Sequence, residues 1–224
     1  MFHLSNLIPK NIKKIIKKIL GYDRINIPNL DDDRQIEWSW SIKYLPHNKK
    51  VLDIGCCYSI ISATASRLGN QVVGIDLNND IHYSFDNFRF LEGNIIDLEL
   101  KEKFDSIILA STIEHVGLSG RYNSPEDKDG DLKTMQKIKD LLIEGGEVIL
   151  TIPVGQDMVF KPFHRIYGKE RLPVLLEGFE VVASEFWIKS DKVNWKEVSK
   201  EKALSEIGSE CYYGLGLFKL KLTL

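Results

Sequence analysis

Two acidic residues, each at the end of a β-branched run, are the first candidates for chemistry in this chain. Asp53 ends the run KVLD and is followed two residues later by Gly55, and Asp76 ends the run QVVGID. Such runs predict buried strands, and a glycine directly after a strand permits a sharp turn into a helix. Ligands of open α/β sheets bind at the carboxyl ends of strands. Both acids are therefore candidate ligand-binding residues.

The turn after Asp53 differs from a dinucleotide-binding turn. A nicotinamide fingerprint reads GxGxxG, whereas this chain has Cys57 and Ser59 after Gly55. An acid at the strand end repels a pyrophosphate but suits an ammonium group, and the free amides at the start of the next helix suit a carboxylate. A ligand with both groups is an amino acid. An amino acid joined to a nucleoside is S-adenosylmethionine.

Further residues at predicted strand ends suit the nucleoside and the methyl group. Asp76 can accept hydrogen bonds from both ribose hydroxyls. Asn94 can read the adenine edge, and Ile95 can offer its backbone amide and an apolar contact. Ser111 follows the fourth predicted strand, where the methyl group would point. The predicted cofactor-binding residues are Asp53, Gly55, Cys57, Ser59, Asp76, Leu77, Asn94, Ile95 and Ser111.

The elements that must position these residues alternate along the chain from residue 50. Strands are predicted at 50–54, 71–76, 88–91, 104–110, 147–152, 179–188 and 212–222. Helices are predicted at 60–68, 131–143, 169–176 and 195–207. The alternation predicts an α/β fold: a Rossmann-like, seven-stranded, mostly parallel sheet with an antiparallel edge strand and helices on both faces.

Four motifs in register resemble class I S-adenosylmethionine-dependent methyltransferases. They are the turn 53–59, Asp76, the pair GN at 93–94, and FDSIILASTIEHVG at 104–117. The resemblance implies S-adenosylmethionine as cofactor and a methyltransferase domain at 48–224, preceded by an N-terminal helical extension at 1–47. The chain departs from the family pattern at three positions. Glycines are usual where it has Cys57 and Ser59, and aspartate is usual where it has Asn94.

The stretch 111–182 resembles a methyltransferase-like family of unknown function. The shared features are EHVGL, GRY, IPVG, HRIYG and RLP. This stretch is also similar to methyltransferases encoded beside sugar and polysaccharide biosynthesis genes. The resemblance implies methyl transfer to an oxygen of a sugar, a nucleotide-sugar or another small polar metabolite.

Two histidines are candidate general bases for such a transfer. His115 follows the fourth predicted strand and His164 follows the fifth. An imidazole with a pKa near ~6.5 can take a hydroxyl proton at neutral pH, but either ring can instead make a structural hydrogen bond. Glu114 and His115 are also similar to the end of a metal-binding E-x-x-E-H pattern whose first acid is replaced here by Ser111. A Glu–His pair offers too few ligands, so we predict no metal.

Polar residues in the same two loops are candidates for contacting the methyl acceptor. Arg121 and Tyr122 lie in the first loop, and Arg165 and Tyr167 in the second. Arginines at such a site can clamp a phosphate or a carboxylate. The alternative is that they pair with the nearby acids at 126–129. We predict that these four residues contact the substrate, and that Asp131 caps the helix after the first loop.

Composition limits the partners and the location. A formal net charge of −2 argues against a general nucleic-acid-binding protein, so a small-molecule or saccharide substrate is expected. The three cysteines form no disulfide framework or zinc pattern, which favours the cytoplasm. Residues 7–20 combine apolar residues at helical spacing with lysines. This segment can lie weakly on an anionic membrane surface or dock on its own domain.

Two other functions stay open at this point. A non-catalytic binding module could keep the fold without the chemistry, because fold alone does not carry function. A nicotinamide-dependent oxidoreductase would share the sheet, but Asp53 disfavours it.

Overall fold

The computed structural model describes residues 33–120, 125–189 and 194–223. Residues 33–224 form one compact unit. The predicted lysine-rich helix at 7–20 and two predicted substrate residues, Arg121 and Tyr122, lie outside the described residues. Within the described ranges, no helix is long and apolar enough to cross a membrane.

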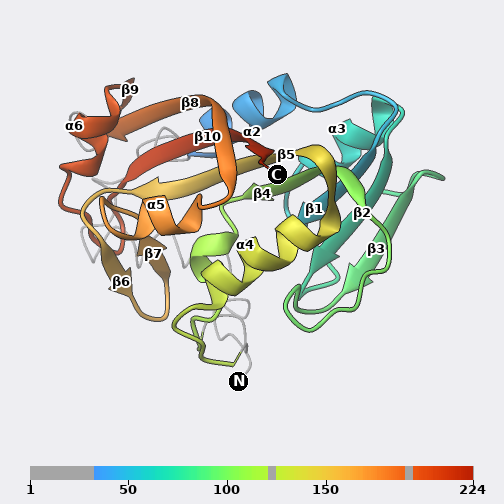
Figure 1. The fold of residues 1–224 in the computed structure, drawn as a ribbon, viewed down its shortest axis with the longest axis horizontal. Helices are drawn as coiled ribbons and strands as arrows, with labels where there is room; N and C mark the ends of the chain where they lie inside the picture. The colour runs from blue at the N-terminus through green and yellow to red at the C-terminus, as the bar shows by residue number, and fades with distance from the viewer. Residues whose placement is uncertain (1–32, 121–124, 190–193, 224) are drawn as a thin grey trace, which may run out of the picture. The chain divides into compact units, whose positions relative to one another are not determined.

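An eight-stranded sheet with the order β3-β2-β1-β4-β5-β10-β8-β9 forms the centre of this unit (Figure 1). Its strands are β1 (Lys50–Ile54), β2 (Gln71–Asp76), β3 (Phe88–Glu92), β4 (Phe104–Ala110), β5 (Leu142–Val154), β8 (Phe179–Lys189), β9 (Trp195–Glu197) and β10 (Gly214–Leu222). Strands β1 to β5 pair in parallel, and β10 is antiparallel to both β5 and β8. The predicted Rossmann-like, mostly parallel sheet is confirmed, but it has eight strands and not the predicted seven, because β9 adds to its edge.

The carboxyl-terminal edge of the sheet differs from the prediction. Residues 195–207 were expected to form one helix, but they contain the short strand β9 and the helix α6 (Lys200–Leu204). Strand β9 pairs with β8, the Trp195 ring lies beside Tyr213, and the Lys189 ammonium lies 5.1 Å from the Trp195 ring centroid. These tertiary contacts override the helical spacing. The antiparallel strand β10 lies inside the sheet because it pairs with both β5 and β8, and β9, which pairs only with β8, forms the edge.

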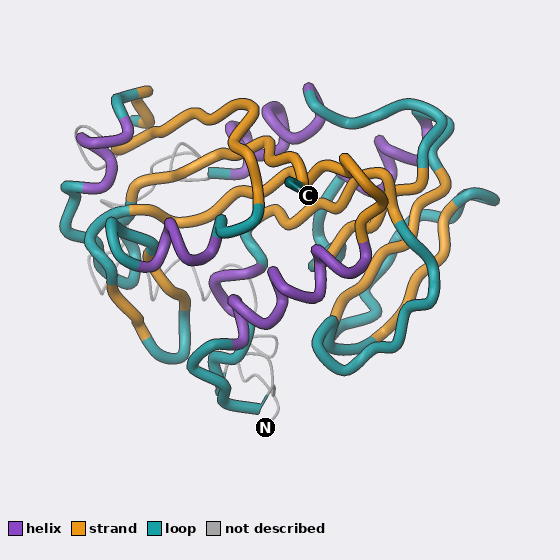
Figure 2. The backbone as a smooth tube through the Cα atoms, viewed as in Figure 1, coloured by secondary structure: helices purple, strands orange, loops and turns teal. Residues whose placement is uncertain are grey.

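Helices cover both faces of the sheet (Figure 2). They are α2 (Arg34–Lys43), α3 (Ile61–Arg67), α4 (Gly130–Leu141) and α5 (Arg171–Leu175), with a short 3-10 helix, η3 (Ile113–His115), after β4. Neighbouring strand residues point to opposite faces. Leu52 accordingly joins a buried cluster with α4 and α5, whereas Val51 joins a second cluster with α2 and α3. The helices are therefore sorted between the two faces by strand alternation.

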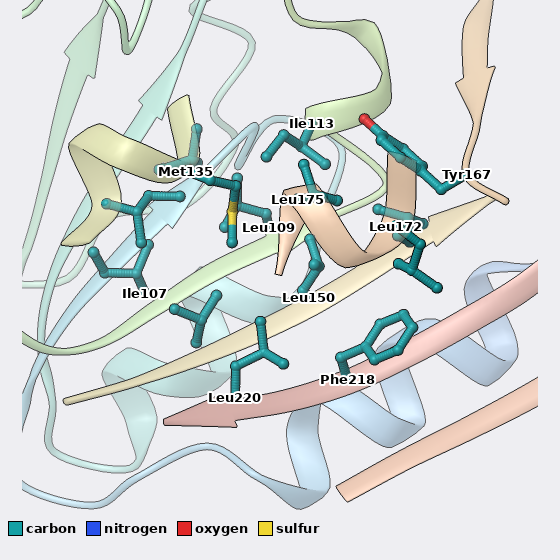
Figure 3. Close-up of a cluster of buried hydrophobic side chains, with 14 of the residues drawn as sticks. Ile107, Leu109, Ile113, Met135, Leu150, Tyr167, Leu172, Leu175, Phe218 and Leu220 are labelled. Atoms are coloured by element: carbon teal, nitrogen blue, oxygen red, sulfur yellow. The ribbon is translucent and has the colours of Figure 1, made fainter. Parts of the chain in front are cut away.

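The first cluster forms the larger core. Figure 3 shows Leu109 and Leu150 of the sheet beside Met135 of α4 and Leu172 of α5. Each of these side chains is at most 2% exposed, and burying such a side chain stabilises a fold by roughly 1.5–3 kcal/mol. This packing fixes the strand ends that carry the candidate site.

A two-stranded hairpin, β6 (Met158–Phe160) and β7 (His164–Ile166), follows β5 and was not predicted. Each strand has three residues, too few for a strand period to be visible in the sequence. Strand β7 of the hairpin contacts η3, which follows β4. Directly after β7, Tyr167 forms a β-bridge with Val154 of β5. The hairpin therefore supplies one wall of the region next to η3.

Candidate functional site

A cavity of about 360 Å³ opens at the carboxyl ends of the parallel strands. Strand β1 lies between β2 and β4, which is where the strand order reverses and where open α/β sheets bind their ligands. The volume is within the range of small-molecule sites. The lining comes from the turn after β1, from the ends of β2, β3 and β4, and from Arg34 of α2.

Eight of the nine predicted cofactor residues line this cavity. They are Gly55, Cys57, Ser59, Asp76, Leu77, Asn94, Ile95 and Ser111. Their role in binding the cofactor stays a prediction.

Asp53 is the exception, because it does not line the cavity. Its side chain is buried, and its carboxylate accepts a hydrogen bond of 2.7 Å from the Ser62 hydroxyl of α3. Burial raises the pKa of Asp53 to about 6. The structure therefore places this acid behind the turn, where it ties β1 to α3.

The turn after β1 is closely fixed by its neighbours. Gly55 has φ +80°, and a Cβ there would lie 2.1 Å from Oγ1 of Thr112. Only glycine fits both the conformation and the space. The Cys57 amide donates to Oδ2 of Asp76 at 2.9 Å, and the Asn78 amide donates to Oδ1 at 3.0 Å. Asp76 thus holds two loops together at the cavity wall and keeps further lone pairs for a ligand.

Cys56, Cys57 and Asp76 bring three ligand atoms within 4.8 Å of one another. Metals bind thiolates, and burial raises the pKa of the Cys57 thiol to about 11 and that of the Cys56 thiol further. Both thiols are therefore protonated at neutral pH. The Cys57 thiol also donates to the Asn78 carbonyl at 3.1 Å. We interpret the cluster as packing of the turn.

Tyr58 lines the cavity but was missed by sequence reasoning. It has φ +60°, a conformation that bulky residues rarely adopt, and it is 73% exposed. In the sequence it stands between Cys57 and Ser59, the two positions where the family pattern usually has glycines. That irregularity was the available signal for its unusual conformation.

The end of β4 forms another wall of the cavity, and a buried carboxylate of α2 is hydrogen-bonded to it. Ser111 has φ +47°, and its hydroxyl donates to Glu37, which also accepts from the Thr151 hydroxyl at 2.6 Å. Glu37 is fully buried, and burial with the nearby Asp33 charge raises its pKa to about 7. Sequence reasoning missed Glu37, because nothing in a helix sequence indicates a partner more than 70 residues away.

His115 lines this wall as predicted for a base. Its Nδ1 lies 2.5 Å from the Phe163 carbonyl oxygen, and its Nε2 lies 3.6 Å from Oε1 of Glu114. Because a carbonyl oxygen only accepts, we assign the ring proton to Nδ1. Glu114 is buried, and burial with the Glu37 charge raises its pKa to about 8. The sequence alone left the role of His115 open, and the structure brings it to the cavity.

His164 does not line the cavity. Its ring is buried, 5.2 Å from the Tyr213 ring and 5.8 Å from the Phe160 ring, measured between centroids. This geometry favours a structural role over the predicted role as a base.

Arg165 and Tyr167 require a correction of the predicted substrate contacts. Arg165 is 1% exposed, and its guanidinium donates to the carbonyl oxygens of Glu114, Val116, Asp127 and Lys128. Tyr167 is fully buried and donates to Asp131 at 3.0 Å. Neither residue lines the cavity. Arg165 holds the described ends of the loop between η3 and α4, and Tyr167 is bonded to the first turn of α4.

Asp131 was expected to cap α4, but the structure gives it another role. It is fully buried, it accepts from Tyr167, and it forms a bidentate pair with Arg171. Helix α4 begins at Gly130 after Asp129, without a side-chain cap. The acid at the helix start is therefore used for tertiary pairing.

Leucine at position 57 is expected to weaken binding of S-adenosylhomocysteine. Cys57 lines the cavity and is 8% exposed, so the larger side chain must enter the ligand space. Overpacking of this kind costs about 1–3 kcal/mol, roughly a 5- to 150-fold loss of affinity by calorimetry. Cys57→Gly is the matched control, and its affinity should stay near that of the wild type. Normal binding by Cys57→Leu would show that the ligand lies elsewhere.

The raised pKa of Glu114 predicts that stability falls with rising pH. Unfolded Glu114 ionises near pH 4.5, whereas the folded protein keeps the proton until about pH 8. Between these values the folded state binds more protons, so the free energy of unfolding decreases as pH rises, and the effect ends above the folded pKa. The slope for one such group is at most about 1.4 kcal/mol per pH unit. Glu37 adds to it up to about pH 7.

Urea unfolding at pH 5, 6, 7 and 8 measures this slope. Glu114→Gln should flatten it, because glutamine does not titrate. Glu126→Gln is the control: Glu126 is exposed and its pKa is lowered by Lys161, so its titration lies below this window. A slope that is the same in all three proteins would contradict the prediction.

Comparisons with known proteins agree on the fold. The family described as "Caenorhabditis protein of unknown function, DUF268" matches residues 70–211, more than half of the chain. A 1,6-didemethyltoxoflavin-N1-methyltransferase from Burkholderia thailandensis, solved with 1,6-didemethyltoxoflavin and S-adenosylhomocysteine, aligns with TM-score 0.60 at 14% identity. That alignment covers 97% of this chain and 91% of the other.

Two further structures are similar to the chain. The N-methyltransferase NodS from Bradyrhizobium japonicum WM9, solved with S-adenosylhomocysteine, has TM-score 0.57 and 14% identity, covering 90% of this chain and 91% of the other. A SAM-dependent methyltransferase from Methanosarcina mazei has TM-score 0.56 and 15% identity, covering 81% and 96%. The chain therefore has the fold of S-adenosylmethionine-dependent methyltransferases.

Proposed function

The chain belongs to the family described as "Caenorhabditis protein of unknown function, DUF268", and on this premise we propose that it is an S-adenosylmethionine-dependent methyltransferase. The proposed acceptor is an oxygen of a sugar, a nucleotide-sugar or another small polar metabolite. The observation that carries the proposal is the cavity at the strand-order reversal, lined by eight of the nine residues expected to hold this cofactor.

The residues present fit the cofactor chemically. The cavity has an acid, Asp76, whose carboxylate is already oriented by two backbone amides and suits ribose hydroxyls. Asn94 uses its carbonyl oxygen to accept from the Ile96 amide at 3.1 Å and keeps a second lone pair for an adenine amino group. Gly55 leaves its side-chain space to Thr112, so the turn after β1 packs closely against the residues after β4 at the cavity wall.

The chain's own residues would divide the work of the transfer. When bound, S-adenosylmethionine would supply a methyl group on a positively charged sulfur. His115 would hold the hydroxyl proton of the acceptor, and Ser111, fixed by Glu37, would shape the wall beside it. Arg34, which lines the cavity and lies 3.3 Å from the Glu37 carboxylate, would contribute a positive charge there. Alignment and proton removal are the main contributions that a protein makes to such a displacement.

Calorimetric titration with S-adenosylmethionine, S-adenosylhomocysteine and NAD tests this proposal. We expect both sulfur ligands to bind and NAD to show no binding. Binding of NAD alone would favour the nicotinamide-dependent oxidoreductase. Binding of none of the three would favour the non-catalytic module that has kept the fold.

The acceptor class needs a second experiment. Methyl-labelled S-adenosylmethionine is incubated with the protein and with sugars, nucleotide-sugars and small amines, and label transfer is measured by mass spectrometry. Transfer to a hydroxyl group is expected. Transfer to an amine instead would keep the methyltransferase and replace the proposed acceptor.

A further inference from the structure

The carboxyl group of Glu114 is the polar group that the proposed chemistry has not yet used. It lies in η3 directly before His115, and the residue is 2% exposed. Its Oε2 has no hydrogen-bond partner among the residues that the structure describes. A buried carboxylate without a partner is costly, so the group must either hold a proton or lie next to a cation.

The groups that face Glu114 come from four parts of the chain. They are His115 of its own turn; Asp33, Arg34 and Glu37 at α2; Arg165 and Tyr167 around β7; and Tyr213 before β10. The negative charges of Glu37 and Asp33 oppose ionisation of Glu114, whereas the positive charge of Arg34 favours it. Burial also disfavours ionisation of Glu114 and is the largest of these effects. The carboxyl group is therefore held in its neutral form well above the usual range of a glutamate.

His115 is a neighbour whose ring can take up a proton. Its Nδ1 points to the Phe163 carbonyl oxygen, so Nε2 is the ring nitrogen that can accept a proton. That nitrogen lies 3.6 Å from Oε1 of Glu114, within ion-pair distance. Two titrating groups this close lose their protons as a pair. One proton can reside on the carboxyl group or on the imidazole, and while it resides on the imidazole Nε2 is occupied.

We propose that Glu114 is a positioning residue that shares a single proton with His115. His115 can take the hydroxyl proton of the methyl acceptor only after the shared proton has left the imidazole. The proposal rests on the proposed function for the identity of the acceptor. In the competent state Glu114 is a carboxylate and His115 is neutral. His115 would then take the hydroxyl proton of the methyl acceptor at Nε2 as the acceptor oxygen bonds the methyl carbon, and the sulfur of the donor would keep the electron pair of the broken bond.

The same arrangement stabilises the product state of the proton transfer. The imidazolium formed at Nε2 lies beside the Glu114 carboxylate, so the buried negative charge gains its cation in that step. An ion pair in a buried site is worth more than one in water. Glu114 thereby suppresses the base at low pH and supports it once the shared proton is lost.

The test is an NMR titration that needs neither cofactor nor acceptor. The full chain, with ¹³C label in histidine and glutamate, is titrated from about pH 3 to pH 10. His115 and Glu114 signals are assigned from His115→Gln and Glu114→Gln. In the wild type, the Glu114 carboxyl and the His115 ring signals should change with common midpoints. In Glu114→Gln, the pKa of His115 should fall by about one pH unit, because the neighbouring carboxylate is gone.

Glu126→Gln is the control carboxyl deletion, since Glu126 is exposed and pairs with Lys161. It should leave the His115 midpoint unchanged. Separate midpoints in the wild type, with Glu114 near 4.5, would overturn the proposal, as would an unchanged His115 pKa in a folded Glu114→Gln variant. If that variant does not fold, the wild-type titration decides. S-adenosylhomocysteine calorimetry on the wild type tests the proposed function separately, so either idea can fail alone.

Discussion

Arg165→Ala is expected to lower the free energy of unfolding by about 3–5 kcal/mol. The guanidinium is buried and is the donor to four backbone carbonyl groups, at Glu114, Val116, Asp127 and Lys128. Its Nε also lies 3.8 Å from buried Asp131. Alanine would remove this donor from all four carbonyls, of which Asp127 keeps a bond from the Gly130 amide and Lys128 keeps one from Arg171. It would also leave Asp131 with less positive charge around it. Urea unfolding at pH 7 measures the loss.

Arg89→Ala is the matched control for this prediction. Arg89 also pairs with an acid, Glu102, but its side chain is 55% exposed. Exposed pairs contribute about 0–1 kcal/mol. If the two alanine variants lost the same stability, Arg165 would not hold the loop as described. Arg165→Lys should recover only part of the loss, because one ammonium group cannot reach carbonyls on both sides of the loop.

Asp76→Ala is expected to weaken binding of S-adenosylhomocysteine by about 2–3 kcal/mol, roughly 30- to 150-fold. The carboxylate is expected to accept hydrogen bonds from both ribose hydroxyls. It also accepts from the amides of Cys57 and Asn78, which fix two lining loops. Its removal therefore takes away ligand contacts and loosens the walls that remain. Calorimetric titration gives the affinity, and circular dichroism shows whether the variant is folded.

Glu92→Ala separates the effect of position 76 from a general loss of charge. Glu92 ends the neighbouring strand β3 in register with Asp76, but its carboxylate contacts Asn79 and does not line the cavity. The affinity of Glu92→Ala for S-adenosylhomocysteine should stay within about twofold of the wild type, since surface substitutions away from a site usually change free energies by less than about 0.5 kcal/mol. Equal affinities in wild type and Asp76→Ala would show that this acid does not hold the ribose.

The sequence by itself determined the parallel half of the sheet. Strands at 50–54, 71–76 and 104–110 were predicted with the bounds that the structure has. These segments are buried β-branched runs bounded by turn residues, so local pattern and tertiary environment agree. The turn at Gly55 and the acid at Asp76 followed from the same strand ends. Residues fixed by strand ends were therefore predictable, and most of them line the cavity.

Tertiary structure alone decided which polar residues face the cavity and which hold the scaffold. Arg165 and Tyr167 have the residue types of a substrate clamp, yet they are buried against the loop after β4. Glu37 stands between Ile36 and Trp38 in α2, and its hydrogen bond with Ser111 fixes that residue beside the cavity. The physical reason is that the role of a charged side chain depends on partners far away in the sequence. Periodicity reports only which face of an element is apolar, so it cannot supply those partners.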